Sequence, residues 1–104
     1  MTKSDFKKQV VRNLKPLKPE KVILFGSLST GKFVAGKSDI DLLIIKNTEK
    51  KMGDRYVQAR LLLPDNPPFD LFVLTQNEIK EKLQNSFFFR DIIQHGEVLY
   101  EKKE

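Results

Sequence analysis

Three aspartates set against apolar segments are the residues of this sequence best suited to chemistry. Asp39 and Asp41 flank the start of the apolar run IDLLII at residues 40–45, and Asp70 lies near the start of FDLFVL at residues 69–74. Side chains alternate along a strand, so Asp39 and Asp41 are expected to share one face. An unpartnered buried carboxylate is strongly unfavourable. The spacing therefore predicts a paired-carboxylate site that faces a cleft or a cation.

The expected cation is a hard divalent metal ion. If the aspartates converge, charges about 5 Å apart at an effective dielectric near 20 repel by roughly 3 kcal/mol per pair. Carboxylate oxygens in such a cluster suit Mg²⁺ or Mn²⁺. Two ions about 3.5 to 4 Å apart would activate an attacking hydroxyl and neutralise a leaving pyrophosphate. The alternative is that Asp39 and Asp41 are solvated at a sheet edge and that Asp70 is a turn residue.

A Gly-Ser pair precedes the aspartates. Gly26 and Ser27 directly follow the apolar residues 22–25. Glycine lets a phosphate approach the backbone, serine donates a hydrogen bond, and a helix starting there would direct free N–H groups at an anion. Ser27 could equally be a helix N-cap, a role compatible with phosphate contact. Lys32 and Lys37, in the loop that follows, either contact phosphate or are solvated.

The elements that must position these residues alternate between strands and helices. Apolar runs predict strands, and apolar spacing of three and four residues or capping signals predict helices. Thr75 and Glu78 form a capping-box pattern. This interleaving predicts an α/β or α+β domain with three to four strands. The first predicted strand begins at Lys21 or Val22 and ends at Phe25, and the others cover 40–46, 69–74 and 97–100, with an exposed connection over 47–53. The first predicted helix has Thr2 or Ser4 as its N-cap and is ended by Pro16 and Pro19. The other predicted helices cover 56–63, 76–83 and 87–94, the last with Ser86 as N-cap and Gly96 as C′ residue.

Length and composition bound the function classes. The 104 residues predict a single domain over 1–104, and the sequence holds neither an apolar run of membrane-spanning length nor a signal-peptide pattern. We therefore expect a cytoplasmic protein. Zero cysteines and a single histidine exclude disulfides and argue against a zinc hydrolase. The net charge of +5 comes from lysines spread along the chain, so direct nucleic-acid binding is not expected.

The motifs together resemble a known superfamily. FGS, eleven residues, DIDLLI and then FDLFVL resemble the nucleotidyltransferases of the DNA polymerase β type. The length and layout resemble the minimal nucleotidyltransferase (MNT) proteins, which are antitoxin partners of HEPN-domain toxins. The resemblance covers residues 21–100 and implies a polymerase β-like fold, with a small mixed sheet of three to four strands flanked by helices.

The resemblance also implies roles for individual residues. Gly26 and Ser27 would hold the nucleotide phosphates. Asp39 and Asp41 would ligate the metal ions, and Asp70 would be the third ligand, next to the attacking hydroxyl. Many MNT proteins have arginines just after the Gly-Ser pair, where this sequence has Leu28 and Thr30. Lys32 or Lys37 would then supply the positive charge.

The expected function is Mg²⁺-dependent transfer of AMP from ATP, or of a nucleotide from another nucleoside triphosphate, to an acceptor hydroxyl. The resemblance implies that the acceptor is a HEPN-domain RNase on a separate chain, silenced by protein adenylylation. One alternative is a weakly active or inactive binding module that neutralises its partner by contact. Another is a catalytic module for a small-molecule or RNA acceptor.

The segment after Ser86 carries two further features. His95 is expected in the last helical turn before Gly96, where a cation complements the helix dipole, which is a structural role. Phe87, Phe88 and Phe89 cannot all face one core from one helix. At least one of them is expected to be exposed and could mark a protein-binding patch.

Overall fold

A computed structural model describes residues 3–26, 31 and 39–103. Its sheet has the strand order β3-β2-β1-β4. β1 pairs antiparallel with both β2 and β4, and β2 pairs parallel with β3, so the predicted mixed α/β architecture with three to four strands is confirmed. The elements are α1 (Lys3–Leu14), the 3-10 helix η1 (Lys15–Leu17), β1 (Lys21–Phe25), β2 (Ile40–Ile45), α3 (Met52–Arg60), β3 (Phe69–Leu74), α4 (Gln76–Asn85), α5 (Phe87–His95) and β4 (Glu97–Glu101).

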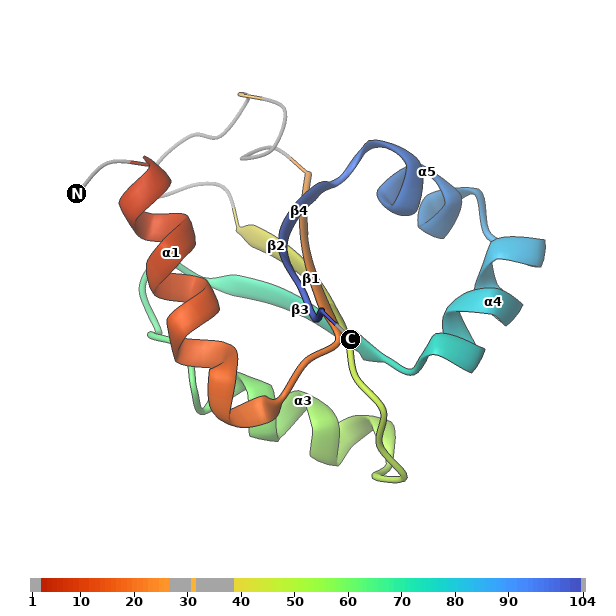
Figure 1. The fold of residues 1–104 in the computed structure, drawn as a ribbon, viewed down its shortest axis with the longest axis horizontal. Coiled ribbons are helices and arrows are strands. Elements are labelled where there is room, and N and C mark those ends of the chain that lie inside the picture. Colours follow the sequence, from red (N-terminus) through yellow and green to blue (C-terminus); the bar gives the residue numbers. More distant parts are fainter. Residues whose placement is uncertain (1–2, 27–30, 32–38, 104) are drawn as a thin grey trace.

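The sheet separates two helical layers, with α1 and α3 on one face and α4 and α5 on the other (Figure 1). Alternation along β2 sends Leu42 and Ile44 into the core under α1 and α3. Leu43 and Ile45 enter the core under α4 and α5. Because helices cover both faces, β2 reads as an almost continuous apolar run. No helix in the described part of the chain is long and apolar enough to cross a membrane.

Several helix boundaries differ from the sequence predictions, among them the starts of α1 and α3 and the end of α3 at Arg60. α1 already includes Ser4, which is therefore not its N-cap, and Thr2 lies outside the described residues. α3 begins at Met52, within the segment predicted to be an exposed connection. The predicted apolar position Tyr56 is exposed, and its neighbour Arg55 is buried with only 7% of its surface accessible. No sequence prediction was made for Arg55.

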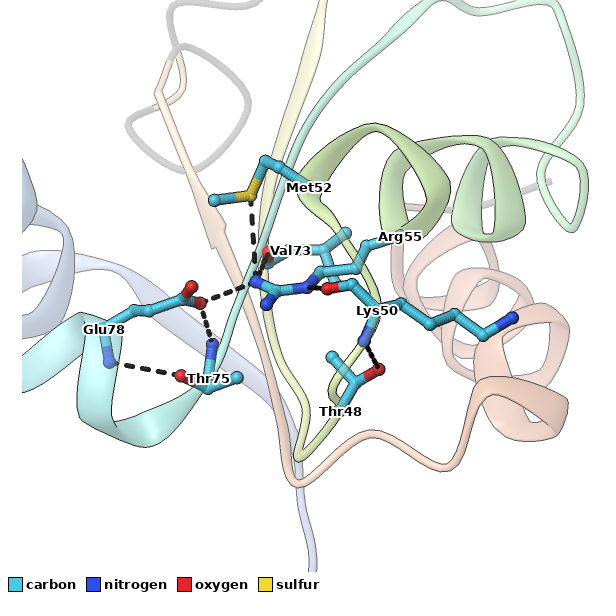
Figure 2. Close-up of polar contacts among 7 residues, drawn as sticks. All are labelled: Thr48, Lys50, Met52, Arg55, Val73, Thr75 and Glu78. Atoms are coloured by element: carbon cyan, nitrogen blue, oxygen red, sulfur yellow. Dashed lines mark hydrogen bonds and ion pairs between the residues drawn. The ribbon is translucent and has the colours of Figure 1, made fainter.

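The buried guanidinium of Arg55 has several polar partners (Figure 2). Its Nη1 lies 2.6 Å from Glu78 Oε1, and its Nε donates to the Lys50 carbonyl at 2.7 Å. Nη1 also donates to the Val73 carbonyl at 3.4 Å. The hydrogen bond from Arg55 is the main reason that the pKa of Glu78 lies below its usual value. The ion pair therefore joins α3 to the start of α4 on the far side of β3.

Glu78 has a second role, in the predicted capping box. The Thr75 amide donates to Glu78 Oε1 at 2.7 Å, and the Glu78 amide donates to Thr75 Oγ1 at 3.2 Å (Figure 2). The capping-box prediction is confirmed. The capping box joins residues three positions apart and could be predicted from the sequence. The contact between Glu78 and Arg55 joins residues 23 positions apart and could not.

The junction from α5 to β4 confirms one cap and corrects another. Ser86 Oγ accepts from the Phe89 amide at 3.3 Å, as predicted for an N-cap. Gly96 has an extended backbone rather than the left-handed one of a glycine C′ cap. A Cβ atom on Gly96 would lie 2.5 Å from both Ile23 Cγ2 and the Ile92 carbonyl oxygen. Glycine is needed there because the start of β4 packs closely against β1.

Candidate active site

The parallel pairing of β2 with β3 places Asp41 directly beside Asp70. Alternation puts Asp41 on the same face as Leu43, and Asp70 on the same face as Leu74. Leu43 and Leu74 both belong to the core under α4 and α5. The two carboxylates therefore lie side by side at one end of the sheet, on the α4/α5 face.

The electrostatics of this end of the sheet are repulsive. Burial raises the pKa of Asp41 above its usual value, and the negative charges of Asp70 and Asp39 raise it further, in that order of importance. Asp39 itself is exposed and lies one residue before β2. The structure thus brings Asp41 and Asp70 into register and places Asp39 close enough to add to the field at Asp41.

Gly26 lies against the Asp41 side chain. The antiparallel pairing sets Phe25 opposite Asp41, and Gly26 follows with a φ of +75°. A Cβ atom at Gly26 would lie 2.0 Å from Asp41 Oδ2. Both the positive φ and this close approach require glycine. Of the other predicted nucleotide-binding residues, Ser27, Lys32 and Lys37 lie outside the described residues.

The carboxylates open into a cleft of about 300 Å³. Much of its wall comes from α5, which the sequence analysis did not connect with the site. Phe88 packs edge-on against Phe25 with ring centroids 5.7 Å apart, so this helix is fixed over the end of β1. The cleft is lined by Phe25, Gly26, Asp41, Asp70, Phe88, Asp91, Ile92, His95 and Gly96.

The carboxylate pair fits a Mg²⁺ site that substrate oxygens complete. Among the described residues, no group of three or more Asp, Glu, His and Cys side chains is arranged to hold a metal ion. Mg²⁺ is usually held by only one or two carboxylates together with water and substrate phosphates. Asp41 and Asp70 supply that number of hard donors. A bound cation would also relieve the repulsion that raises the pKa of Asp41.

Comparison with known families decides the class of the protein. The family model described as polymerase beta, nucleotidyltransferase, matches residues 7–104. The chain belongs to this nucleotidyltransferase family. The match includes every strand of the sheet and both Asp41 and Asp70. The four-stranded mixed sheet with its flanking helices is thus a polymerase β-like nucleotidyltransferase fold, as the sequence motifs predicted.

Comparison with solved structures adds one relative of this nucleotidyltransferase. It is a crystal structure from Sulfolobus solfataricus, provisionally described as a nucleotidyltransferase. The two proteins share 26% identity over 78% of this chain and 82% of the other, with a TM-score of 0.46. No curated protein matches the sequence. The family membership rests on the family model alone.

Proposed function

We propose that this nucleotidyltransferase moves AMP from ATP to an acceptor hydroxyl with the help of Mg²⁺. Nucleotidyl transfer in general follows from the family. The observation that carries the proposal is the register of β2 with β3, which sets Asp41 beside Asp70 in a cleft bordered by the Gly26 backbone. Two carboxylates that repel each other beside a close-approach glycine suit a metal-bound triphosphate better than any neutral ligand.

Each residue of the site has a proposed task. Asp41 and Asp70 hold the metal, with Asp39 as a further ligand, and Asp70 lies nearest to the attacking hydroxyl. Gly26 leaves room for the Asp41 carboxylate and borders the cleft that a phosphate would enter, and Ser27 donates to that phosphate. The metal, when bound, supplies Lewis-acid stabilisation of the charge that develops on the phosphate oxygens. Lys32 and Lys37 are the proposed cationic contacts to the same triphosphate.

The proposed acceptor is a HEPN-domain RNase on a separate chain, and adenylylation of this toxin would make the protein its antitoxin. This part of the proposal is supported by the resemblance of the FGS, DIDLLI and FDLFVL motifs, and of their spacing, to MNT proteins. An ATP donor and a cysteine-free sequence are consistent with a cytoplasmic site of action. Phe87, 84% exposed at the start of α5, offers an apolar contact for such a partner.

Label transfer from α-labelled ATP tests the proposal. The protein is incubated with Mg²⁺ and a HEPN-domain protein encoded by a neighbouring gene, and label on the partner is measured. Asp41→Asn should lower the transfer about 10³-fold. Asp54→Asn, which removes an exposed carboxylate from the first turn of α3, is the matched control and should leave transfer unchanged. If wild type and Asp41→Asn are equally silent while the two proteins still bind each other, the contact-only binding module replaces the enzyme.

Metal binding can be measured without any acceptor. A ligand at ten times its dissociation constant stabilises the folded state by about 1.4 kcal/mol. Mg²⁺ should therefore raise the free energy of unfolding of the wild type and not that of Asp41→Asn. An equal effect of Mg²⁺ on both proteins would place the metal elsewhere.

A further inference from the structure

One face of α5 forms a wall of the cleft that holds the carboxylate pair. Phe88, Asp91, Ile92 and His95 all line the cleft, and their spacing of three, one and three residues places them on one side of a helix. Ile92 is buried in the core under α5, which fixes the orientation of the helix. The helix therefore holds Asp91 and His95 at the edge of the cleft, where each side chain is 67% exposed.

Asp91 and His95 form a polar pair within this wall. His95 Nδ1 lies 2.9 Å from Asp91 Oδ1. A carboxylate only accepts hydrogen bonds, so Nδ1 is assigned as the nitrogen that carries the hydrogen. In the neutral ring, Nε2 then holds the free lone pair. Among the described residues, Nε2 has no hydrogen-bond partner.

The surroundings of this pair are those of an active site. Asp41 of β2 and Asp70 of β3 line the same cleft, and α5 adds the carboxylate of Asp91 to the lining. His95 is the only side chain in this lining that can take up a proton at a nitrogen atom. A carboxylate that fixes the tautomer of an imidazole, whose other nitrogen is free in a cleft, is an arrangement suited to general base catalysis.

We propose that His95, oriented by Asp91, accepts the proton of the acceptor hydroxyl during nucleotidyl transfer. This role rests on the proposed function. The hydroxyl oxygen forms a bond to the α-phosphorus while its proton passes to His95 Nε2. The bond from the α-phosphorus to the bridging oxygen breaks, and pyrophosphate leaves with that electron pair. The imidazolium then returns its proton to pyrophosphate or water. His95 is the catalytic residue of this step and Asp91 a positioning residue.

Chemical rescue distinguishes this role from a structural one. General base removal typically lowers rates by about 10² to 10⁴-fold. His95→Ala should therefore lower kcat at least about 100-fold and leave the KM for ATP unchanged. Added imidazole should restore turnover in His95→Ala and not in Asp41→Asn. The side chain of His95 is 67% exposed, so its removal should leave the fold intact.

Two further variants complete the experiment. Gln94→Ala alters an exposed residue in the same helical turn that does not line the cleft, and it should turn over like the wild type. Asp91→Asn keeps the shape of the side chain and should lose activity, though less than His95→Ala. Asp91→Asn with wild-type activity would remove the positioning role of Asp91.

The remaining outcomes separate the two proposals. Full activity of His95→Ala, or a loss that imidazole does not restore, would overturn the role of His95 and leave the nucleotidyltransferase proposal standing. A wild type as silent as Asp41→Asn, with every acceptor tried, would instead overturn the proposed function, and the role of His95 would fall with it.

Discussion

Two charged clusters lie toward opposite ends of β3 and are built in opposite ways. Arg55 and Glu78 form a pair of opposite charges, 2.6 Å apart, with the nearby backbone carbonyls also bound. Asp41 and Asp70 are like charges set side by side by strand register. The first cluster holds the pKa of Glu78 down, and the second pushes the pKa of Asp41 up.

The difference separates a structural from a functional use of charge. The charge of Arg55 is paired with Glu78, and the guanidinium also donates to two backbone carbonyls. This cluster therefore needs no ligand to balance its charge. Among the described residues, the Asp41 cluster holds negative charges that raise the pKa of Asp41, which is the property expected of a metal and phosphate site. Substitutions in the first cluster should mainly change stability, and those in the second should mainly change activity.

The largest expected effect is on activity in the carboxylate cluster. Asp41→Asn or Asp70→Asn should lower transfer about 10³-fold, since loss of metal-based charge stabilisation is worth several kcal/mol in the transition state. Each should at the same time raise the free energy of unfolding, because the repulsion between Asp41 and Asp70 is removed. Label transfer and urea unfolding on the same samples measure the expected fall in transfer rate and the expected rise in the free energy of unfolding. A variant that loses stability as well as activity would mean that the carboxylates have a structural role.

The next effect is on stability in the opposite-charge cluster. Arg55→Leu leaves Glu78 and the Val73 carbonyl without their partner, and it should cost about 3 kcal/mol. Arg60→Leu, later on the same helix, breaks a pair with the fully exposed Asp65 and should cost much less, because water screens an exposed pair. Urea unfolding measures both. Equal costs would show that the burial of Arg55 contributes nothing.

A pair of glycines tests the close approach to Asp41. Gly26 and Gly31 both have positive φ, so alanine should cost about 1 kcal/mol of stability at either position. Gly26→Ala places a Cβ against Asp41, whereas a Cβ on Gly31 would meet no atom of the described residues within 4 Å. We expect Gly26→Ala to displace Asp41 and so lower the transfer rate at least about tenfold, which corresponds to about 1.4 kcal/mol of activation free energy. Gly31→Ala should leave the transfer rate unchanged. Equal transfer rates for the two variants would contradict this reading of Gly26.

The smallest effect is a pH dependence of opposite sign in the two clusters. The pKa of Glu78 is lowered, so its contribution to stability is present above its ordinary value of 4.5 and is lost as the pH falls through the folded-state pKa. The pKa of Asp41 is raised, so its contribution is complete below its ordinary value of 3.8 and is lost as the pH rises through the folded-state pKa.

Two amide variants measure these slopes. At pH 7, Glu78→Gln should be less stable than the wild type and Asp41→Asn more stable. Both differences should shrink when urea unfolding is repeated at pH 3. Differences that do not change between pH 7 and pH 3 would show that neither effect comes from ionisation.

Sequence patterns predicted the elements best where the signal was local. The apolar residues 69–74 became β3 with the predicted bounds, and Ser86 became the N-cap of α5. Met52 was missed as a helix start, because no capping side chain precedes it. Gly96 was predicted to be a glycine C′ cap with a left-handed backbone. The structure instead requires glycine there because a Cβ would collide with Ile23 of β1.

The candidate site divides in the same way. The spacing of Asp39 and Asp41 behind a Gly-Ser pair is enough to point to one end of the sheet. That α5 returns to this end was not readable, although Phe88, Asp91 and His95 have helical spacing. The pattern fits any amphipathic helix, and nothing in it names the surface that the helix covers.

The sequence by itself determined the local structures and the kind of chemistry. Strand alternation, capping residues and the types of the side chains are properties of neighbours along the chain. Only the tertiary structure decided that Asp41 lies beside Asp70, that Arg55 meets Glu78, and that His95 shares a cleft with both aspartates. These pairings join residues 23 to 54 positions apart, and they depend on strand register and on the docking of helices against a common sheet. Burial of the two apolar faces of that sheet sets the register and the docking, and it is a property of the whole chain.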